Sequence, residues 1–188
     1  MRGGNQTVVN MVLSLALVGI VAATLYVVIP HDEDKDPIKT VSTRVEIDIA
    51  RRAAPYAIAA PVGLPPGWRA TSVTYRGKSD HGAIWHLGYL TPGKEYVGVE
   101  QSDTERVKQY VADVTHKAKQ AGAPIEVKGK KWTRHQGEKY NALIREEPGV
   151  TTVVTGTAPE QDLLRMVQAL KAEKAARPSF SPQPSGSP

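Results

Sequence analysis

The sequence opens with an apolar segment that constrains everything after it. Val8 to Ile29 contains 22 residues (29 − 8 + 1) and no charged side chain. As a helix, with a rise of about 1.5 Å per residue, the segment is about 33 Å long, and the hydrocarbon core of a bilayer is about 30 Å thick. Val8–Ile29 therefore predicts a single transmembrane helix, with the lipid bilayer as a partner of the chain.

A cleaved signal peptide is the main alternative for this segment. Signal peptides have an apolar core of about 7–15 residues that ends at a small-residue cleavage site. Here the small-residue cluster Ala22-Ala23 is followed by Leu25 to Ile29, so cleavage would fall inside the apolar segment. Length therefore favours an uncleaved anchor. Gly19 and Ala23 have the small-xxx-small spacing found at contacts between membrane helices, so an oligomer is a further expectation.

The flanks of the segment predict its orientation. Arg2 and the α-amino group precede it, whereas the residues from His31 to Asp36 are net acidic. Positive residues favour the cytoplasmic side of a membrane. We therefore expect a cytoplasmic N-terminus at residues 1–7 and an extracytoplasmic chain from residue 30 onward, in the cell envelope.

Charge and cysteine content narrow the possible functions. The chain has a formal net charge of +5 and no cysteine. The lack of cysteine excludes disulfides, thiolate zinc sites and lipoprotein acylation. A basic protein often binds nucleic acid, but behind an outward-facing anchor the charge favours anionic lipid headgroups or acidic envelope polymers. Nucleic acid is not an expected partner.

The remaining chain divides into three parts by composition. Residues 30–43 have the charges and prolines of a juxtamembrane linker, and residues 44–174 have the length of one domain. Residues 175–188 are rich in proline and serine, which predicts a disordered tail.

Residues 44–174 alternate strand-like runs with helical patterns. Strands are expected at 69–76, 83–91, 96–101, 125–128, 131–135, 140–146 and 150–156, after a short helix at 44–54. Capping boxes at Ser102–Glu105 and Thr157–Glu160 predict two longer helices, which end near Ala121 and Lys174. The predicted fold class is α+β: an antiparallel sheet of about five to six strands, with the two capped helices covering one face.

One histidine pair is the candidate for chemistry. Asp80, His81 and His86 place two imidazoles and a carboxylate near one another in the sequence. Such groups serve metal sites and hydrolases, but the spacing alone is weak support, since His81 is expected in a loop and His86 in a strand. The chain also lacks a G-x-S-x-G motif. We therefore assign no catalytic residue, metal ligand or cofactor.

A basic run follows the first long helix. It combines Trp132 with five cations, and two interpretations are open: a patch for anionic surfaces, or an exposed edge strand whose lysines discourage pairing with other chains. Trp132, Trp68 and Trp85 are expected in the core. The five cations are Lys128, Lys130, Lys131, Arg134 and Lys139.

Several short blocks of the chain resemble a known family. They are Ala54-Pro55-Tyr56, Leu64–Arg69 (LPPGWR), Trp85–Pro92 (WHLGYLTP), Glu100-Gln101-Ser102 and Val153–Ala158 (VVTGTA). Over roughly residues 8 to 172 the chain is similar to the DUF4245 family, actinobacterial single-pass membrane proteins of unknown function. The resemblance implies a location and a shared fold, and no catalytic residues. The order of elements is also similar to Mog1/PsbP-like α+β domains, an analogy that carries no function.

Two functions from different classes remain as hypotheses. The preferred one is a non-enzymatic binding or scaffold domain of the cell envelope, whose partner is a protein, an anionic lipid or a polymer. The alternative is an envelope enzyme of the hydrolase type that uses Asp80, His81 and His86. A structure in which these three converge would favour the enzyme.

Overall fold

A computed structural model of the chain describes residues 4–28 and 40–175. These residues fall into two units, one that contains the N-terminal helix and one that begins at Lys39 and contains the folded domain. Each unit is described by itself. Most of the predicted linker and all but the first residue of the predicted tail lie outside the described residues.

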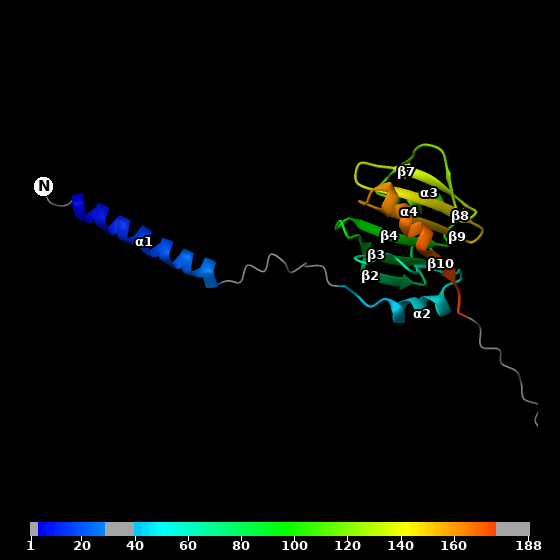
Figure 1. Ribbon diagram of the computed structural model, residues 1–188, viewed down its shortest axis with the longest axis horizontal. Coiled ribbons are helices and arrows are strands. Elements are labelled where there is room, and N and C mark those ends of the chain that lie inside the picture. The colour runs from blue at the N-terminus through cyan, green and yellow to red at the C-terminus, as the bar shows by residue number, and fades with distance from the viewer. Residues whose placement is uncertain (1–3, 29–39, 176–188) are drawn as a thin grey trace, which may run out of the picture. The chain divides into compact units, whose positions relative to one another are not determined.

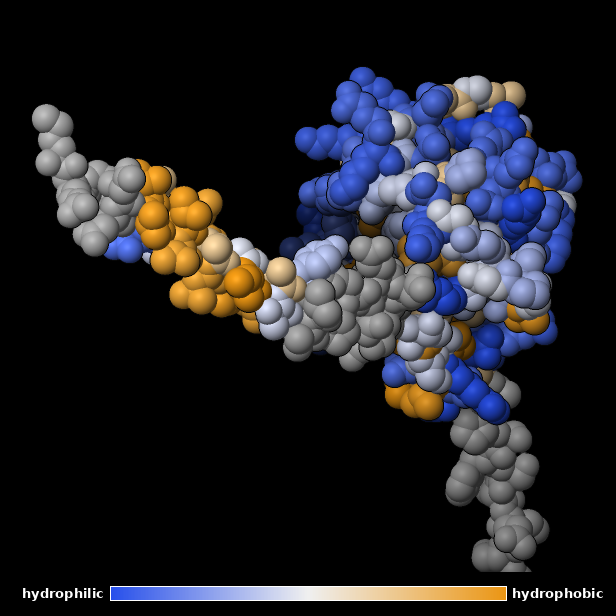
Figure 2. All heavy atoms as spheres, turned by 60° about the vertical axis from the view of Figure 1, so that its left-hand side comes forward, coloured by the Kyte–Doolittle hydropathy of each residue, from blue (hydrophilic) through white to orange (hydrophobic). Residues whose placement is uncertain are grey.

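The N-terminal unit is the helix α1 (Gly4–Val28). From Val8 to Tyr26 it is long and apolar enough to cross a membrane, a property that signal sequences share. The polar Thr24 donates its hydroxyl to the Ile20 carbonyl at 2.7 Å, so the helix itself satisfies this group. Figure 2 shows the apolar surface of α1 in orange.

The folded domain is built on an antiparallel sheet of eight strands, which confirms the α+β class with more strands than expected (Figure 1). The strand order is β2-β3-β4-β9-β8-β7-β5, and β6 also pairs with β7. A second sheet pairs β1 with β10. The elements are α2 (Arg44–Ala53), β1 (Ile58–Pro61), β2 (Arg69–Arg76), β3 (Ile84–Leu90), β4 (Tyr96–Ser102), α3 (Val107–Val114), β5 (Lys119–Gln120), β6 (Ile125–Val127), β7 (Lys130–Gln136), β8 (Asn141–Glu147), β9 (Val150–Gly156), α4 (Glu160–Ala169) and β10 (Leu170–Glu173).

The helices α3 and α4 pack on opposite faces of the sheet. Leu163 of α4 joins the main core, which includes Leu143 of β8. Tyr110 of α3 joins a separate cluster with Ile144, the next residue of β8. Successive side chains of a strand point to opposite faces, so the expectation that both helices cover one face is wrong. Their apolar stripes do not specify which face each one covers.

The first capping box does not start a helix. Ser102 still belongs to β4, where it pairs with Thr151 of β9. Its hydroxyl donates to the His81 carbonyl and accepts the Thr104 N–H, so the serine organises the loop after the strand. The helix begins only at Val107, after an N-cap residue without a side-chain cap.

The second capping box is also wrong. The Thr157 hydroxyl accepts the Tyr96 N–H at 3.0 Å and donates to the Glu95 carboxylate at 2.5 Å. The helix α4 starts at Glu160 with Pro159 as its N-cap. It ends at Ala169 rather than near residue 174, because the following residues extend and pair with β1.

Two of the three tryptophans are fully buried, as expected for core residues. Trp85 and Trp132 belong to the main core, and Trp68 is half-buried against it. The Trp85 indole N–H donates to the Ala59 carbonyl at 3.0 Å. Buried indoles need such a partner, so this bond fixes β1 against the sheet.

Candidate functional site

The centre of the candidate site is His86 in the middle of β3. Its neighbours Trp85 and Leu87 enter the main core, so His86 points to the other face. Its Nδ1 lies 2.6 Å from Glu100 Oε1, and its Nε2 lies 2.8 Å from Ser72 Oγ. Three neighbouring strands thus each contribute one polar side chain to a linear network, which we call the Ser72–His86–Glu100 network.

Burial and charge oppose each other within this network. The side chains of His86 and Glu100 are 29% and 14% exposed. Burial lowers the pKa of His86, but the hydrogen bond and the charge of Glu100 outweigh it, so the pKa is raised from 6.5. Burial also raises the pKa of Glu100, against the opposite influence of His86. The imidazolium form of His86 is therefore stabilised beside the carboxylate.

Two glycines form the floor of the site. A Cβ atom on Gly88 would lie 2.3 Å from Ser72 Oγ and 3.1 Å from the Tyr96 ring. A Cβ atom on Gly98 would lie 2.8 Å from Tyr96 Oη and 3.2 Å from Glu100 Oε1. Glycine at both positions therefore lets the serine hydroxyl and the tyrosine ring lie close to the sheet.

His81 lies apart from the network, bound to α3. Its Nε2 is 2.9 Å from Asp113 Oδ2, and its ring centroid is 5.5 Å from that of Tyr110. His81 Nδ1 and Tyr110 Oη are buried without a hydrogen-bond partner among the described residues. The Asp80 carbonyl accepts a bond from Arg106 at 2.6 Å. The structure therefore does not bring Asp80, His81 and His86 into one network, and no group of three or more acidic or histidine residues in the described chain could hold a metal ion.

The five cations of the basic run do not form one surface. Lys130 pairs with Glu147 at 3.2 Å, and Arg134 pairs with Glu160 at 2.7 Å. Lys131 points to the opposite side of β7 from these two, since it follows Lys130 directly. Lys128 lies in the turn before β7. Lys139 lies in the hairpin beyond β7, 5.4 Å from the Tyr140 ring.

The strand β7 is not an edge of the sheet. It pairs with β8 on one side and with both β5 and β6 on the other. The interpretation of its lysines as protection of an exposed edge is therefore wrong. The separate strands predicted at 125–128 and 131–135 are confirmed as β6 and β7. The prediction missed only β5, which is two residues long and lies where the end of a helix was expected.

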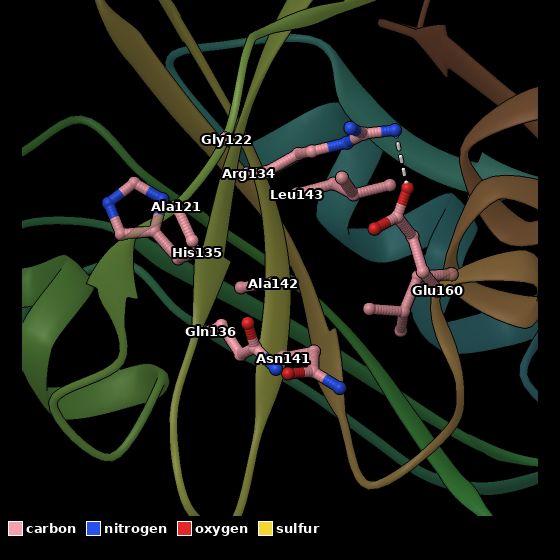
Figure 3. A pocket seen from close by; sticks show the side chains of 10 residues that line it. Ala121, Gly122, Arg134, His135, Gln136, Asn141, Ala142, Leu143 and Glu160 are labelled. Atoms are coloured by element: carbon pink, nitrogen blue, oxygen red, sulfur yellow. Dashed lines mark ion pairs between the residues drawn. The ribbon is translucent and has the colours of Figure 1, made fainter.

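Three cavities adjoin β5 and β7. One of about 320 Å³ is lined by Arg134, Glu160, Gln136 and Asn141 among others, and Figure 3 shows the ion pair of the first two on one side of β7 and His135 on the other. Another, of about 710 Å³, is formed by β5, the end of β7 and the turns next to them. The third, of about 390 Å³, lies between α3 and β7. We call this third cavity the α3 cavity.

The α3 cavity combines an apolar floor with charged groups. Val107, Val111 and Ile144 line it together with Lys108, Lys119, His135 and the carboxylate of Glu146. Burial lowers the pKa of His135, and its Nδ1 is buried without a partner among the described residues. No sequence pattern indicates this cavity, because its walls come from a helix and strands that are distant in the chain.

Comparisons with known proteins support one family. A family described as "Protein of unknown function (DUF4245)" matches residues 4–170. A search of curated proteins gives no match. Among solved structures, the chain is similar to one from the MucA/MucB complex of Pseudomonas aeruginosa, with 16% identity and a TM-score of 0.37. That match covers 62% of this chain and 35% of the other. A similarity at this level supports no inference about the function of this chain.

Proposed function

The chain belongs to the DUF4245 family, and we propose that it is a single-pass membrane protein whose folded domain binds an anionic partner in the cell envelope. The proposed location rests on α1, which is long and apolar enough to span a bilayer. The orientation rests on the charges that flank it, with the N-terminus in the cytoplasm and the folded domain outside.

The α3 cavity is the observation that carries the binding role. Ligand sites usually measure about 300–1,000 Å³ and combine an apolar lining with a few polar groups. Lys108 and Lys119 line this cavity and make no ion pair within the described chain, so an anionic group would gain two charge-assisted hydrogen bonds. A partner with an apolar part and a negative charge fits this lining best.

Cysteine labelling tests the location. The chain has no cysteine, so a single substitution gives a unique label. We expect a membrane-impermeant maleimide to modify the exposed Lys78→Cys variant on intact cells, and to modify Gln6→Cys only after the membrane is opened. The reverse pattern would place the domain in the cytoplasm and reject the proposed orientation.

A titration with indole-3-acetate, a soluble amphipathic carboxylate, tests the cavity. We expect the His135 imidazole signals to shift in NMR spectra of the full chain. The double variant Lys108→Glu/Lys119→Glu should weaken binding at least about tenfold, since each charged hydrogen bond contributes about 1.5–3 kcal/mol. The exposed Lys78→Glu serves as the control. Equal binding by all three proteins would contradict the proposed site.

The Ser72–His86–Glu100 network favours a second candidate, hydrolysis. In this mechanism the Ser72 hydroxyl attacks a carbonyl carbon and its proton passes to His86 Nε2, while Glu100 holds Nδ1. The same proton then goes to the leaving group, and water releases the acyl group from the serine. Since Nε2 must be unprotonated at the start, activity would rise with pH through the raised pKa of His86.

A fluorophosphonate probe tests this candidate directly. Such probes modify only activated serines, so hydrolysis requires labelling of the native chain and none of Ser72→Ala. The labelling should also fall in His86→Gln and increase with pH. A native protein that stays unlabelled would leave the network without a catalytic role.

A further inference from the structure

The exposed apolar side chains of the domain lie at α2 and just after β1. Among the described residues of the domain, three large apolar side chains are well exposed: Val45 (62%), Ile49 (48%) and Val62 (62%). Val45 and Ile49 are four residues apart on α2, which places them one above the other on one helix face. We call Val45 and Ile49 the α2 surface. Figure 2 shows orange spheres beside deep blue ones at this edge of the domain.

The other face of α2 is already packed. Ala50 is fully buried, and Ile47 lies against the main core. Arg51 pairs with Glu173 of β10 at 2.7 Å, and its carbonyl accepts the Ala175 N–H at 3.1 Å. The helix is therefore fixed in place, and its outward residues have no further core to enter.

Val62 does not belong to this helix. It follows β1, and its N–H donates to the Ala169 carbonyl at the end of α4 at 2.9 Å. Val62 is therefore positioned by β1 and α4 and is not part of the α2 surface.

Charges border the α2 surface. Arg44 and Arg52 are exposed and make no ion pair within the described chain. The helix also carries two acids, the exposed Glu46 and Asp48, whose side chain is 48% exposed and lies 3.7 Å from Arg51. A helix that combines outward apolar side chains with arginines is typical of the interface between water and lipid. Basic residues next to anionic headgroups strengthen binding to such a surface.

The chain that joins α1 to α2 is short. Sixteen residue steps separate Val28 from Arg44, and even a fully extended chain of this length spans at most about 55 Å. If α1 spans a bilayer, the effective concentration of lipid at the α2 surface is therefore high, and weak contacts suffice. A soluble partner would have no such advantage.

We propose that the α2 surface rests on the membrane that α1 spans, with Val45 and Ile49 among the headgroups and with Arg44 and Arg52 on anionic lipid. The proposal rests on the membrane anchorage described above. It gives the domain a defined face toward the bilayer.

A label on α2 tests the proposal in the full chain. Ile49→Cys carries an environment-sensitive nitrobenzoxadiazole dye, and the protein is reconstituted in vesicles of phosphatidylcholine and phosphatidylglycerol. We expect emission shifted to the blue and quenching by lipids that carry a nitroxide. The control, Glu126→Cys at an exposed position of β6, should keep the emission of a dye in water. Arg44→Glu/Arg52→Glu should abolish most of the quenching of the α2 label.

Other outcomes distinguish a failure of the α2 proposal from a failure of the proposed membrane anchor. If the protein sediments with the vesicles but the α2 dye remains in water, the α2 proposal is overturned and the anchor stands. If the protein does not sediment with the vesicles, the anchor itself fails. If the dye is shielded equally in detergent micelles, in proportion to protein concentration, a second copy of the chain covers this face and the proposal is again rejected.

Discussion

Replacement of Glu100 by glutamine should reverse the direction of the His86 pKa shift. In the native chain, burial lowers this pKa and Glu100 raises it, with a net increase. Glutamine keeps the size of the side chain and an acceptor oxygen, but it removes the charge. The remaining influences, burial and the charge of Arg76, both lower the pKa. We therefore expect the pKa of His86 to fall below 6.5, the ordinary value for a histidine.

The same substitution should cost stability in a defined pH window. A hydrogen bond to a charged group contributes about 1.5–3 kcal/mol, and a neutral one about 0.5–1.5 kcal/mol. The expected loss is therefore about 1–1.5 kcal/mol. It applies between the raised pKa of Glu100 and the raised pKa of His86, where both groups are charged. The advantage of the native chain disappears as pH rises through the His86 pKa, since a raised pKa stabilises only the protonated state.

NMR titration of the His86 imidazole and denaturation at several pH values measure the two effects. Glu126→Gln, which replaces an exposed carboxylate on β6, is the matched control and should leave the His86 titration unchanged. A His86 pKa that stays above 6.5 in Glu100→Gln would refute the reasoning, because Glu100 would then not be the cause of the increase.

Three substitutions and one control test the packing of the domain, each by chemical denaturation. Gly156→Ala should lose about 3 kcal/mol, because the new Cβ would lie 1.9 Å from the Tyr96 carbonyl oxygen. Gly93→Ala, with ordinary contacts, should change stability by less than about 0.5 kcal/mol. Gln101→Leu should lose about 2–4 kcal/mol, since it leaves the buried Ala59 N–H without its acceptor at 2.7 Å. Leu163→Ala, fully buried on α4, should lose about 2–5 kcal/mol through the cavity it creates. Losses below half these values would indicate that the core relaxes around the changes.

Local patterns in the sequence predict the hairpins well. The β3–β4 turn at residues 92–95 and the Pro148-Gly149 turn both lie where the prolines and glycines indicate. Gly149 has φ of +80°, a conformation that glycine adopts at no steric cost. The conformation of a turn depends on about four consecutive residues, so it can be predicted from the sequence alone.

The complete Ser72–His86–Glu100 network could not be predicted from the sequence, because part of it depends on long-range strand pairing. The hairpin register places His86 opposite Glu100, so this half of the network follows from the turn between the two strands. Ser72 joins through the β2–β3 pairing, which contains a bulge between Ala70 and Ser72 that shifts the register by one residue. A one-residue shift exchanges the two faces of a strand, so no pattern in β2 alone assigns Ser72 to the His86 face.

The capping boxes were wrong for a related reason. Ser102 and Thr157 both have the residue types of an N-cap, but in the folded domain their hydroxyls bind distant partners, the carbonyl of His81 and the carboxylate of Glu95. A hydroxyl satisfied by tertiary contacts is no longer available to cap the next helix. The helices form nevertheless, because their apolar faces are buried against the sheet.

Simultaneous replacement of His86 and Glu100 by leucine tests whether the Ser72–His86–Glu100 network contributes to the stability of the domain. Largely buried ion pairs cost desolvation, and their replacement by apolar side chains is often neutral or stabilising, whereas removal of one partner costs about 3–5 kcal/mol. We expect Glu100→Leu alone to be strongly destabilised, and the double variant to lie within about 1 kcal/mol of the native chain in urea denaturation. That result would mean that folding does not require the two polar groups, which would favour a role for the Ser72–His86–Glu100 network in binding or catalysis. A double variant as unstable as the single one would instead make the pair a structural element, and the hydrolase candidate would lose its main support.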